Sequence, residues 1–521
     1  MPTFVDLVHA QMRAEPDAAA VIDGDTRLTY RDLDHRSAQV ANALAAEGVG
    51  VNDRVALLFR NAAEFFELLV GVSRRNAVLV PLNFRLTTTE IAQILGDAEA
   101  RVLIVSYEYR DRVDVIRDAV PSLRTILVLG GSSDGYQSWR DAHPTNAPTL
   151  LATTDQVALL MYTSGTTGTP KGVMISNENW NAAVAAHQDL YAMNSRSVQV
   201  FALPLFHIGG LLIMVLAMSA GACTVLLPDG NPGAIIAAAS RHQATHLLVV
   251  PVLLTAILEF LDDPEPSSAD LSHLRTVFYG ASAMPEALMR RAIERFTSVR
   301  FMSGYGGTET TASMTFLRPD DHDVSDPRAA QRLRSVGRVS ELAEVRIVDP
   351  DTGADLPTGQ TGEIWLRGPQ IARGYWRLPG HTAHAFGAQG WYRTGDGGYL
   401  DQDGYLVLTD RIKDMFISGG ENVYPTEVEH ALLTIPGVRE AVVIGVPHER
   451  LGESGKAFVV LTAGVELTDG ELTQACRERL AGYKCPTSIE RVDQLPRTAS
   501  GKVMRHVLRA RLRQPTASTA R

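Results

Sequence analysis

Short apolar runs alternate with helical patterns along most of this 521-residue chain. Residues 64–74 carry apolar side chains at the spacing of one helix face, and the apolar runs around them have the length of buried strands. Four such runs are residues 55–59, 77–81, 101–105 and 246–250. Because strands that alternate with helices usually form parallel sheets covered by helices, the pattern predicts an α/β fold.

The pattern changes near residue 335. Three apolar runs follow, at residues 345–349, 363–367 and 405–408, and turns rich in glycine, aspartate and proline separate them. Such spacing is typical of hairpin-connected strands. We therefore expect a smaller, mostly antiparallel, β-barrel-like subdomain in this part of the chain.

Beyond residue 410 the pattern becomes α+β. It predicts helices over residues 427–433 and 470–480, and strands over residues 441–446 and 457–461. We place a domain boundary near Asp410, so that residues 1–410 form an N-terminal domain and residues 411–521 a C-terminal one. The smaller part is large enough for an independent domain.

One uncharged run, residues 209–227, nominally reaches the length of a transmembrane helix. Gly221 interrupts it, and the residues after this glycine have the character of a short buried strand. We therefore expect a core helix over about residues 210–220, then a strand, and no membrane span. Residues 1–6 lack a basic segment and a long apolar core, so we expect no signal peptide and a cytoplasmic protein.

Charge and cysteine content narrow the class of protein. Acidic residues outnumber basic ones by 59 to 49, and the net charge of −10 argues against a general nucleic-acid binder. Cys223, Cys476 and Cys485 have no metal-ligand spacing. They indicate a reduced compartment without a disulfide framework.

Residues 162–172 read Tyr-Thr-Ser-Gly-Thr-Thr-Gly-Thr-Pro-Lys-Gly. Such a loop can wrap backbone N–H groups and hydroxyls around phosphate oxygens, with Lys171 as a point charge. It is not the common P-loop pattern, because Pro170 precedes Lys171 and Gly172 follows it. The sequence predicts a polyphosphate site of another kind, and a polar surface turn is the alternative.

Four further segments combine glycine turns with hydroxyl, carboxylate or lysine side chains, at residues 305–310, 391–396, 418–422 and 496–502. Taken singly, each fits a structural loop. In this order they resemble the adenylate-forming superfamily, which includes acyl-CoA synthetases, aryl-CoA ligases, firefly luciferase and the adenylation domains of nonribosomal peptide synthetases. The resemblance covers nearly the whole chain, up to Lys502.

The resemblance implies an enzyme that activates a small-molecule carboxylic acid with ATP and Mg²⁺, releases pyrophosphate, and passes the acyl group from AMP to coenzyme A. It also implies a large N-terminal domain and a small, mobile C-terminal domain. Because activation brings two anions together, the site must neutralise charge and stabilise the leaving pyrophosphate.

The same resemblance gives roles to individual residues. Glu309 is expected to bind Mg²⁺, a hard cation suited to carboxylate oxygens, and Thr308 to contact the α-phosphate. The residues expected to hold the β- and γ-phosphates are Thr163, Ser164, Gly165, Thr166, Thr167, Gly168 and Lys171. Those expected to line the adenine are Gly280, Ala281, Ser282 and Tyr305. Those expected to contact the ribose are Asp396 and Arg411.

The C-terminal domain is expected to supply Lys502, which would bridge the carboxylate and the α-phosphate during adenylation. The resemblance places Lys413 at the position of the family's hinge residue. The residues expected to enter the site for the thiol step are Ser418, Gly419, Gly420 and Glu421. One site cannot easily hold both Lys502 and the pantetheine, which gives a rotation between the half-reactions a physical purpose.

Residues 204–210 resemble the CoA-ligase version of the substrate-side motif. Amino-acid-activating relatives usually carry an aspartate here, whereas His207 follows Phe206 in this chain, so an uncharged fatty or aromatic acid is favoured. His207 would gate the pocket or contact the carboxylate, and a hydrogen-bonded histidine in a packed wall is the alternative. The other candidate wall residues are Val249, Val252, Gly304, Gly306, Thr310 and Thr311. The glycine-rich run at residues 304–307 and the small residues Ala312 and Ser313 permit a long or an aromatic acid without choosing.

Two alternatives stay open. An adenylating enzyme could pass the acyl group to a separate carrier protein or to another nucleophile. A catalytically silent nucleotide-binding regulator is the second, and retention of Lys171, Glu309, Asp396 and Lys502 together argues against it. We expect small-molecule partners, no nucleic acid, and a homodimer as one candidate assembly.

Overall fold

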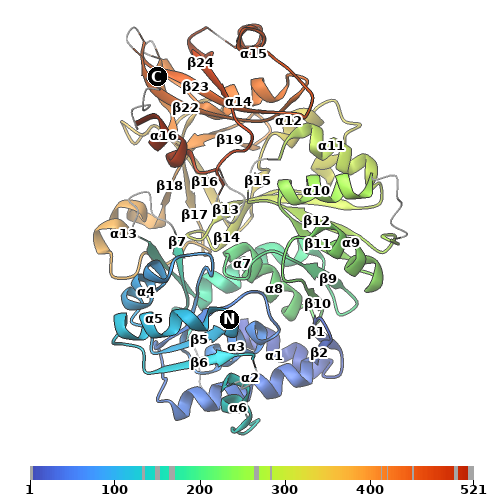
Figure 1. Cartoon of the computed structure of the whole chain (residues 1–521), viewed down its shortest axis with the longest axis vertical. Coiled ribbons are helices and arrows are strands. Elements are labelled where there is room, and N and C mark those ends of the chain that lie inside the picture. Colours follow the sequence, from blue (N-terminus) through green and yellow to red (C-terminus); the bar gives the residue numbers. More distant parts are fainter. Residues whose placement is uncertain are drawn as a thin grey trace, which may run out of the picture. The chain divides into compact units, whose positions relative to one another are not determined.

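The computed structural model describes residues 4–131, 135–146, 153–163, 170–262, 269–281, 284–411, 414–418, 421–448, 451–480, 482–497 and 503–513 (Figure 1). Backbone contacts divide the chain into two units. The first comprises Met1–Glu344 and Leu366–Tyr392, and the second comprises Val345–Trp365 and Arg393–Arg521. Each unit is built around its own sheets and is described separately below.

A six-stranded sheet in the first unit has the strand order β6-β5-β3-β4-β7-β8. Its strands are β3 (Arg54–Leu58), β4 (Val78–Pro81), β5 (Val102–Ser106), β6 (Thr125–Leu129), β7 (Val157–Thr163) and β8 (Lys171–Ser176). The pairs from β6 to β7 are parallel, and the β7–β8 pair is antiparallel. This confirms the strands predicted near residues 55–59, 77–81 and 101–105.

Helices cover both faces of this sheet because alternate residues of β3 point to opposite sides. Val55 and Leu57 pack in the same core cluster as residues of α2 and α3, whereas Ala56 and Leu58 pack with residues of α4 and α5. The helices of this region are α1 (Phe4–Ala14), α2 (Tyr30–Ala46), α3 (Glu64–Arg74), α4 (Thr88–Asp97), α5 (Val113–Ala119), α6 (Gly135–Asp141) and the 3₁₀ turn η1 (Tyr107–Arg112). α3 spans the range that its apolar spacing predicted.

A nine-stranded sheet, with the order β15-β14-β13-β12-β11-β9-β10-β1-β2, completes the first unit. Its central strands from β1 through β10, β9, β11 and β12 to β13 are parallel, and antiparallel pairs flank them. The strands are β1 (Ala19–Asp23), β2 (Thr26–Thr29), β9 (Val198–Phe201), β10 (Cys223–Leu226), β11 (His246–Val249), β12 (Thr276–Tyr279), β13 (Arg300–Gly307), β14 (Ala312–Leu317) and β15 (Arg338–Val339). The predicted strand near residues 246–250 is therefore present as β11.

The helices of this second region follow the same alternation. They are α7 (Asn177–Tyr191), α8 (Ile208–Ser219), α9 (Pro232–Arg241), α10 (Pro251–Leu261), α11 (Glu286–Arg295), α12 (Ala329–Leu333) and α13 (Pro379–Ala385), with the 3₁₀ turns η2 (Pro319–His322) and η3 (Ala388–Gly390). α7 begins at a capping box in which the hydroxyl of Ser176 accepts the N–H of Asn179. Because Ser176 also ends β8, this cap fixes the turn from strand to helix.

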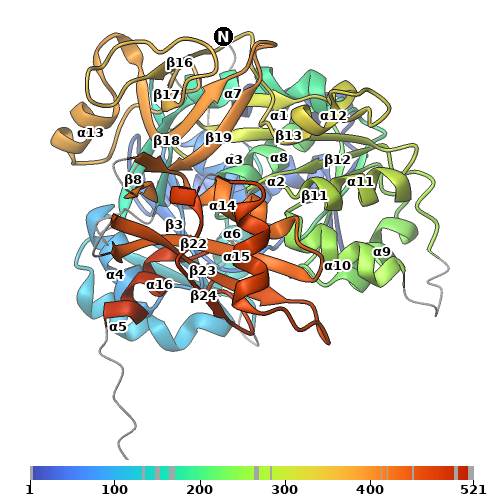
Figure 2. The same cartoon turned by 90° about the horizontal axis from the view of Figure 1, so that it is seen from above.

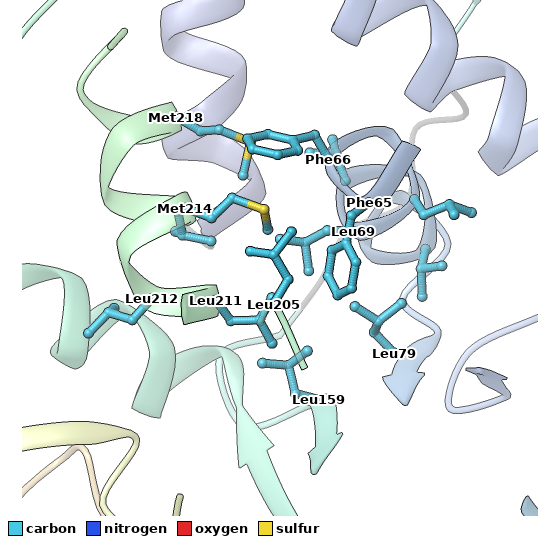
Figure 3. Close-up of a cluster of buried hydrophobic side chains, with 14 of the residues drawn as sticks. Phe65, Phe66, Leu69, Leu79, Leu159, Leu205, Leu211, Leu212, Met214 and Met218 are labelled. Carbon is cyan, nitrogen blue, oxygen red and sulfur yellow. The ribbon is translucent and has the colours of Figure 1, made fainter. Parts of the chain in front are cut away.

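The helix α8 is buried on nearly all sides, which explains its uninterrupted apolar sequence. Met214 and Met218 point from α8 toward Phe65 and Phe66 of α3 (Figure 3). The uncharged run at residues 209–227 is thus a core helix followed by β10, as predicted. Among the residues that the structure describes, no helix is both long enough and apolar enough to cross a membrane.

The second unit contains two sheets. The first has the order β16-β17-β18-β19, from β16 (Glu344–Val348), β17 (Gly362–Arg367), β18 (Tyr392–Leu400) and β19 (Leu406–Arg411). It corresponds to the predicted β-barrel-like subdomain, and β16 and β19 are its two edges. Backbone contacts group most of this sheet with the C-terminal part of the chain.

The second sheet of this unit has the order β21-β20-β23-β22, and β24 pairs with β23. Figure 2 shows β22, β23 and β24 side by side. The strands are β20 (Phe416–Ser418), β21 (Glu421–Val423), β22 (Val438–His448), β23 (Gly452–Leu461) and β24 (Ser488–Arg491); the helices are α14 (Pro425–Leu433), α15 (Asp469–Arg477), α16 (Arg505–Arg513) and the 3₁₀ turn η5 (Gly482–Lys484). Val443 packs with α14 and α15, whereas Val442 packs with α16, so the two sheet faces carry different helices.

A buried ion network fastens α6 to α3. The Glu67 carboxylate is fully buried and accepts hydrogen bonds from Arg140 Nη1 at 2.8 Å and from Tyr136 Oη at 2.6 Å. Arg140 is buried as well and also contacts Asp141. A buried charge is tolerated only when its partners are present.

We therefore expect Arg140→Met to destabilise the first unit by about 3 kcal/mol, because the buried Glu67 charge would keep only the longer ion pair with Arg36, at 3.6 Å, and the Tyr136 hydroxyl. The measurement is urea-induced unfolding followed by circular dichroism. Arg117→Met is the matched control, since Arg117 pairs with Asp114 at the surface, where both side chains are exposed. If both substitutions lowered the free energy of unfolding equally, burial of the Glu67–Arg140 pair would not be the cause of the loss.

Candidate active site

The ends of the predicted phosphate loop are held together by the β7–β8 hairpin. Thr163, the last residue of β7, is the register partner of Lys171, the first residue of β8. Ser164, Gly165, Thr166, Thr167 and Gly168 lie outside the described residues. The antiparallel register thus brings the two predicted phosphate-binding residues Thr163 and Lys171 next to each other.

Thr308 and Glu309 lie in the turn between β13 and β14. The following residues Thr311 and Ala312 have φ values of 46° and 76°, in the left-handed region that residues with a Cβ rarely adopt. The hydroxyl of Thr310 accepts the N–H of Gly307 at 2.7 Å and donates to the carbonyl of Ala312 at 2.6 Å. These bonds close the turn locally and hold its strained backbone.

Gln370 supports this turn from the opposite side and was not predicted from the sequence. Its side chain is fully buried, and its Nε2 donates to the carbonyl of Ser313 at 3.0 Å. The backbone carbonyl of Gln370 accepts a hydrogen bond from the hydroxyl of Thr311 at 2.7 Å. Two residues further on, the N–H of Ala372 donates to the carbonyl of Glu309 at 2.9 Å.

Residues 369–376, which we call the 369–376 segment, run from this turn to β8. Asn179 Nδ2 donates to the carbonyls of Pro369 and Ile371, at 2.8 and 2.7 Å. At the other end, the N–H of Met174 donates to the carbonyl of Gly374 at 2.9 Å, and the N–H of Trp376 to that of Gly172 at 2.7 Å. The segment therefore pairs with β8 beside Lys171.

Tyr375 of this segment contacts both charged residues predicted for the site. Its hydroxyl donates to Glu309 Oε1 at 3.0 Å, and Lys171 Nζ lies 5.2 Å from the centre of its ring. Burial, together with the nearby Glu309 carboxylate, raises the pKa of Tyr375, so the phenol stays protonated and donates. The fold thus gathers a carboxylate and an ammonium around one neutral tyrosine.

The residues predicted for adenine and acid follow the carboxyl ends of neighbouring parallel strands. Gly280 and Ala281 come directly after β12, Val249 ends β11, and Tyr305 lies in β13 beyond the register pair of Tyr279 and Ser303. In open α/β sheets, ligands bind at this edge. Ser282 lies outside the described residues.

A buried pair lies beneath this edge. His322 Nδ1 lies 2.8 Å from the carbonyl of Arg318, so this nitrogen must donate; Nε2 then accepts the Tyr279 hydroxyl at 2.9 Å. Burial lowers the pKa of His322 to about 4, which keeps the imidazole neutral. The pair fixes the end of β12 immediately before Gly280.

His207 is the residue before α8, and its ring packs against Phe206 with a centroid distance of 4.4 Å. Burial, with a smaller effect of Arg85, lowers its pKa to about 4. Its Nε2 is buried and has no hydrogen-bond partner among the described residues. The ring is therefore neutral, and its part in an acyl pocket stays a prediction.

The other predicted wall residues differ in their surroundings. Val249 is buried, whereas Val252 in α10 is 52% exposed. A Cβ on Gly306 would lie 1.9 Å from the carbonyl oxygen of Ala312, and one on Gly304 would lie 2.6 Å from Ser313 Oγ. Both glycines are therefore required by the close approach of β14. The hydroxyl of Thr310 is engaged within the turn, and that of Thr311 donates to the backbone carbonyl of Gln370. The role of these residues in an acyl pocket stays a prediction.

The second unit holds the residues predicted for ribose and coenzyme A. Asp396 of β18 and Arg411 of β19 are register partners, and the N–H of Asp396 donates to Thr394 Oγ1 at 3.0 Å. Ser418 ends β20, is buried, and is the register partner of Glu421. Lys413, Gly419, Gly420 and Lys502 lie outside the described residues. A β-bridge between Arg497 and Val503 holds the two ends of the segment that contains Lys502.

Two protein-family models match this chain. Residues 8–376 match the model of the AMP-binding enzyme family, and residues 427–502 match that of the AMP-binding enzyme C-terminal domain. The chain belongs to the AMP-binding enzyme family. The interval between the two matches includes Asp410, and the boundary predicted there stays a prediction.

Three similar proteins indicate the reaction class. A feruloyl-CoA synthase of Amycolatopsis sp is 39% identical over 502 residues, covering 96% of this chain and 97% of the relative. The fatty acid–[acyl-carrier-protein] ligase ScoC of Streptomyces coeruleorubidus is 34% identical over 516 residues, covering 98% and 96%. The crystal structure of the anthranilate CoA ligase AuaEII in complex with anthranoyl-AMP superposes with a TM-score of 0.88 at 30% identity, covering 98% of this chain and 97% of that one.

These findings confirm the resemblance to the adenylate-forming superfamily and the predicted α/β fold with a small C-terminal domain. They also confirm the enzyme class, an AMP-forming acid–CoA ligase. ATP and coenzyme A are substrates of the CoA ligases in this family. The roles of single residues stay predictions.

Gln370→Met should destabilise the protein by about 1–3 kcal/mol, because the carbonyl of Ser313 would lose its buried donor. The measurement is thermal unfolding by differential scanning calorimetry. Gln199→Met is the matched control, since Gln199 is also buried but neither of its amide atoms has a hydrogen-bond partner among the described residues. A control variant as unstable as Gln370→Met would argue against the support that we assign to Gln370.

Proposed function

We propose that the chain activates a hydrophobic carboxylic acid, fatty or aromatic, with ATP, and then transfers the acyl group to coenzyme A. One observation carries the proposal. Elements distant in sequence bring Glu309 and Lys171 to the same tyrosine, so that a carboxylate and an ammonium serve one site. This is the charge arrangement that a magnesium nucleotide requires.

Mg²⁺ fits the chemistry of Glu309. Among the described residues, no cluster of three or more His, Cys, Asp or Glu side chains could form a metal cage on its own. Mg²⁺ is usually bound by one or two carboxylates together with phosphate oxygens and water, so a single glutamate is sufficient. When bound, the ion would neutralise phosphate charge as pyrophosphate leaves.

In this proposal, different residues of the chain bind different parts of the nucleotide and the acid during adenylation. Lys171 and the loop after Thr163 hold the β- and γ-phosphates, and Thr308 contacts the α-phosphate. Asp396 accepts hydrogen bonds from the ribose hydroxyls, with Arg411 beside it in the register. Lys502 offsets the charge that develops between the acid carboxylate and the α-phosphate.

The second half-reaction is assigned to the C-terminal part of the chain. Ser418, Gly419, Gly420 and Glu421 form the coenzyme A side, and Lys413 is the hinge about which the small domain turns. The support for these roles is the order of the motifs in the family. The same order of motifs supports the proposal that the C-terminal domain is mobile.

An uncharged acid is favoured at the acyl end. His207 is neutral and half-buried, and it stands where amino-acid-activating relatives carry an aspartate, so it offers no fixed anion to an ammonium. The most similar relative described above acts on an aromatic acid, as its name states. Aromatic acids such as phenylpropenoic acids are therefore the first to test, followed by fatty acids.

A carrier protein as acceptor is the second candidate, because ScoC, 34% identical to this chain, is named as a ligase for an acyl carrier protein. Its adenylation step would be the same, so only the acceptor separates the two. The thiol step is therefore the part of the proposal that needs direct measurement.

Pyrophosphate release across a panel of aromatic, fatty and amino acids, with and without coenzyme A, tests the proposal. We expect release with one hydrophobic class, a several-fold faster turnover with coenzyme A, and acyl-CoA as the product by mass spectrometry. Release that coenzyme A does not accelerate, with no thioester formed, would favour the carrier protein. Absence of release with every acid would contradict the enzymatic function.

Lys502→Ala should lower the rate of adenylate formation by about 10²–10³-fold, because its ammonium acts mainly on the transition state. Single-turnover formation of acyl-AMP measures this step. Thioester formation from a supplied acyl adenylate is the internal control and should be largely retained. Unchanged adenylation in this variant would remove Lys502 from the proposed mechanism.

A further inference from the structure

Tyr375 is held in one orientation by contacts from three sides. Its backbone forms a bridge with Val173 of β8, and its N–H donates to Thr382 Oγ1 at 2.9 Å. Its ring packs edge-on against Phe386 with a centroid distance of 5.4 Å, and the residue is only 7% exposed. A side chain that is fixed in this way can also fix the orientation of the groups that it contacts.

The hydroxyl of Tyr375 determines the direction of Glu309. It donates to Oε1 at 3.0 Å, and so it fixes how the carboxylate is turned. The phenol hydroxyl is an uncharged hydrogen-bond donor, so its contact with Glu309 is a hydrogen bond and not an ion pair. A neutral donor orients the carboxylate without cancelling the negative charge that a divalent cation needs.

The ring of Tyr375 contacts the positively charged Lys171. Lys171 Nζ lies 5.2 Å from the ring centroid, within the range of a cation–π contact. An aromatic face attracts an ammonium without neutralising it, whereas a carboxylate at this place would compete with an incoming phosphate. The full positive charge of Lys171 therefore stays available for an anionic ligand.

We propose that Tyr375 is a positioning residue that sets Glu309 for the metal–nucleotide through its hydroxyl and Lys171 for the terminal phosphates through its ring. This inference rests on the proposed function, because it assumes that Glu309 and Lys171 serve a magnesium nucleotide. It assigns two separable tasks to one side chain. The two tasks can be removed one at a time.

Tyr375→Phe removes the hydroxyl and keeps the ring, and Tyr375→Leu removes both. In acid-dependent ATP–pyrophosphate exchange, Tyr375→Phe should raise the Mg²⁺ concentration for half-maximal rate by about tenfold, with an unchanged KM for pyrophosphate. Tyr375→Leu should raise both values. A purely structural role would shift the two values together in both variants.

A second measurement is independent of turnover. Binding of MgATP should raise the melting temperature of the wild-type protein, as any ligand of the folded state does. The gain should be smaller for Tyr375→Phe, whereas melting without ligand should differ little. Tyr191→Phe is the matched control, because the Tyr191 hydroxyl is buried and has no hydrogen-bond partner among the described residues.

A Glu309→Gln background separates positioning from other effects. In this background Tyr375→Phe should no longer change the Mg²⁺ requirement, since the carboxylate that it orients is gone. A wild-type-like Mg²⁺ requirement and thermal gain in Tyr375→Phe would overturn the role of Tyr375 and leave the proposed function standing. A wild-type protein without exchange and without a thermal response to MgATP would overturn both.

Discussion

The 369–376 segment is the constraint on which the first-unit site depends. On one side it is tied to the β13–β14 turn, where Gln370 supports the strained backbone and Ala372 donates to the carbonyl of Glu309. On the other side it pairs with β8 through Gly374 and Trp376, next to Lys171. Glu309 and Lys171 belong to different sheets, so neither sheet alone could set the distance between them. A single stretch of extended chain does so, and its tyrosine contacts both side chains.

The sequence predicted those parts of the structure that depend on local pattern. α3 and the strand β3 follow from apolar spacing, and α8 with β10 follows from the glycine that interrupts an uncharged run. Glu309 and Lys171 were recognisable because they stand in glycine- and threonine-rich turns. Gln370 and Tyr375 were not, because their importance arises from partners far away in the chain, such as Ser313 and Glu309. No turn signature or periodicity records a contact of that kind.

Burial keeps the uncharged groups of the site uncharged. His207 and His322 both have a pKa lowered to about 4, and Tyr375 has its pKa raised, so each is neutral over the range in which a nucleotide is fully ionised. Glu309 and Lys171 are the charged residues that contact Tyr375. Since a substrate with several phosphates is sensitive to every nearby charge, neutral supports let the protein fix geometry without altering the field that the ligand meets.

The glycines of β13 bear on the question of which acid fits. Their small size at residues 304 and 306 at first indicates a roomy pocket for a long or aromatic acid. The structure gives a different reason for them, because a Cβ at either position would collide with Ala312 or Ser313 of β14. Glycine is therefore required at both positions by strand packing, and its presence carries no information on pocket size.

Since one buried methylene changes a rate only by about fourfold, selectivity for one acid must come from pocket walls that the fold leaves free to vary. His207 and Val249 are the positions that we propose for such walls, and they present one neutral ring and one buried aliphatic side chain. In that role both surfaces would favour an apolar acyl group, and neither would specify its length.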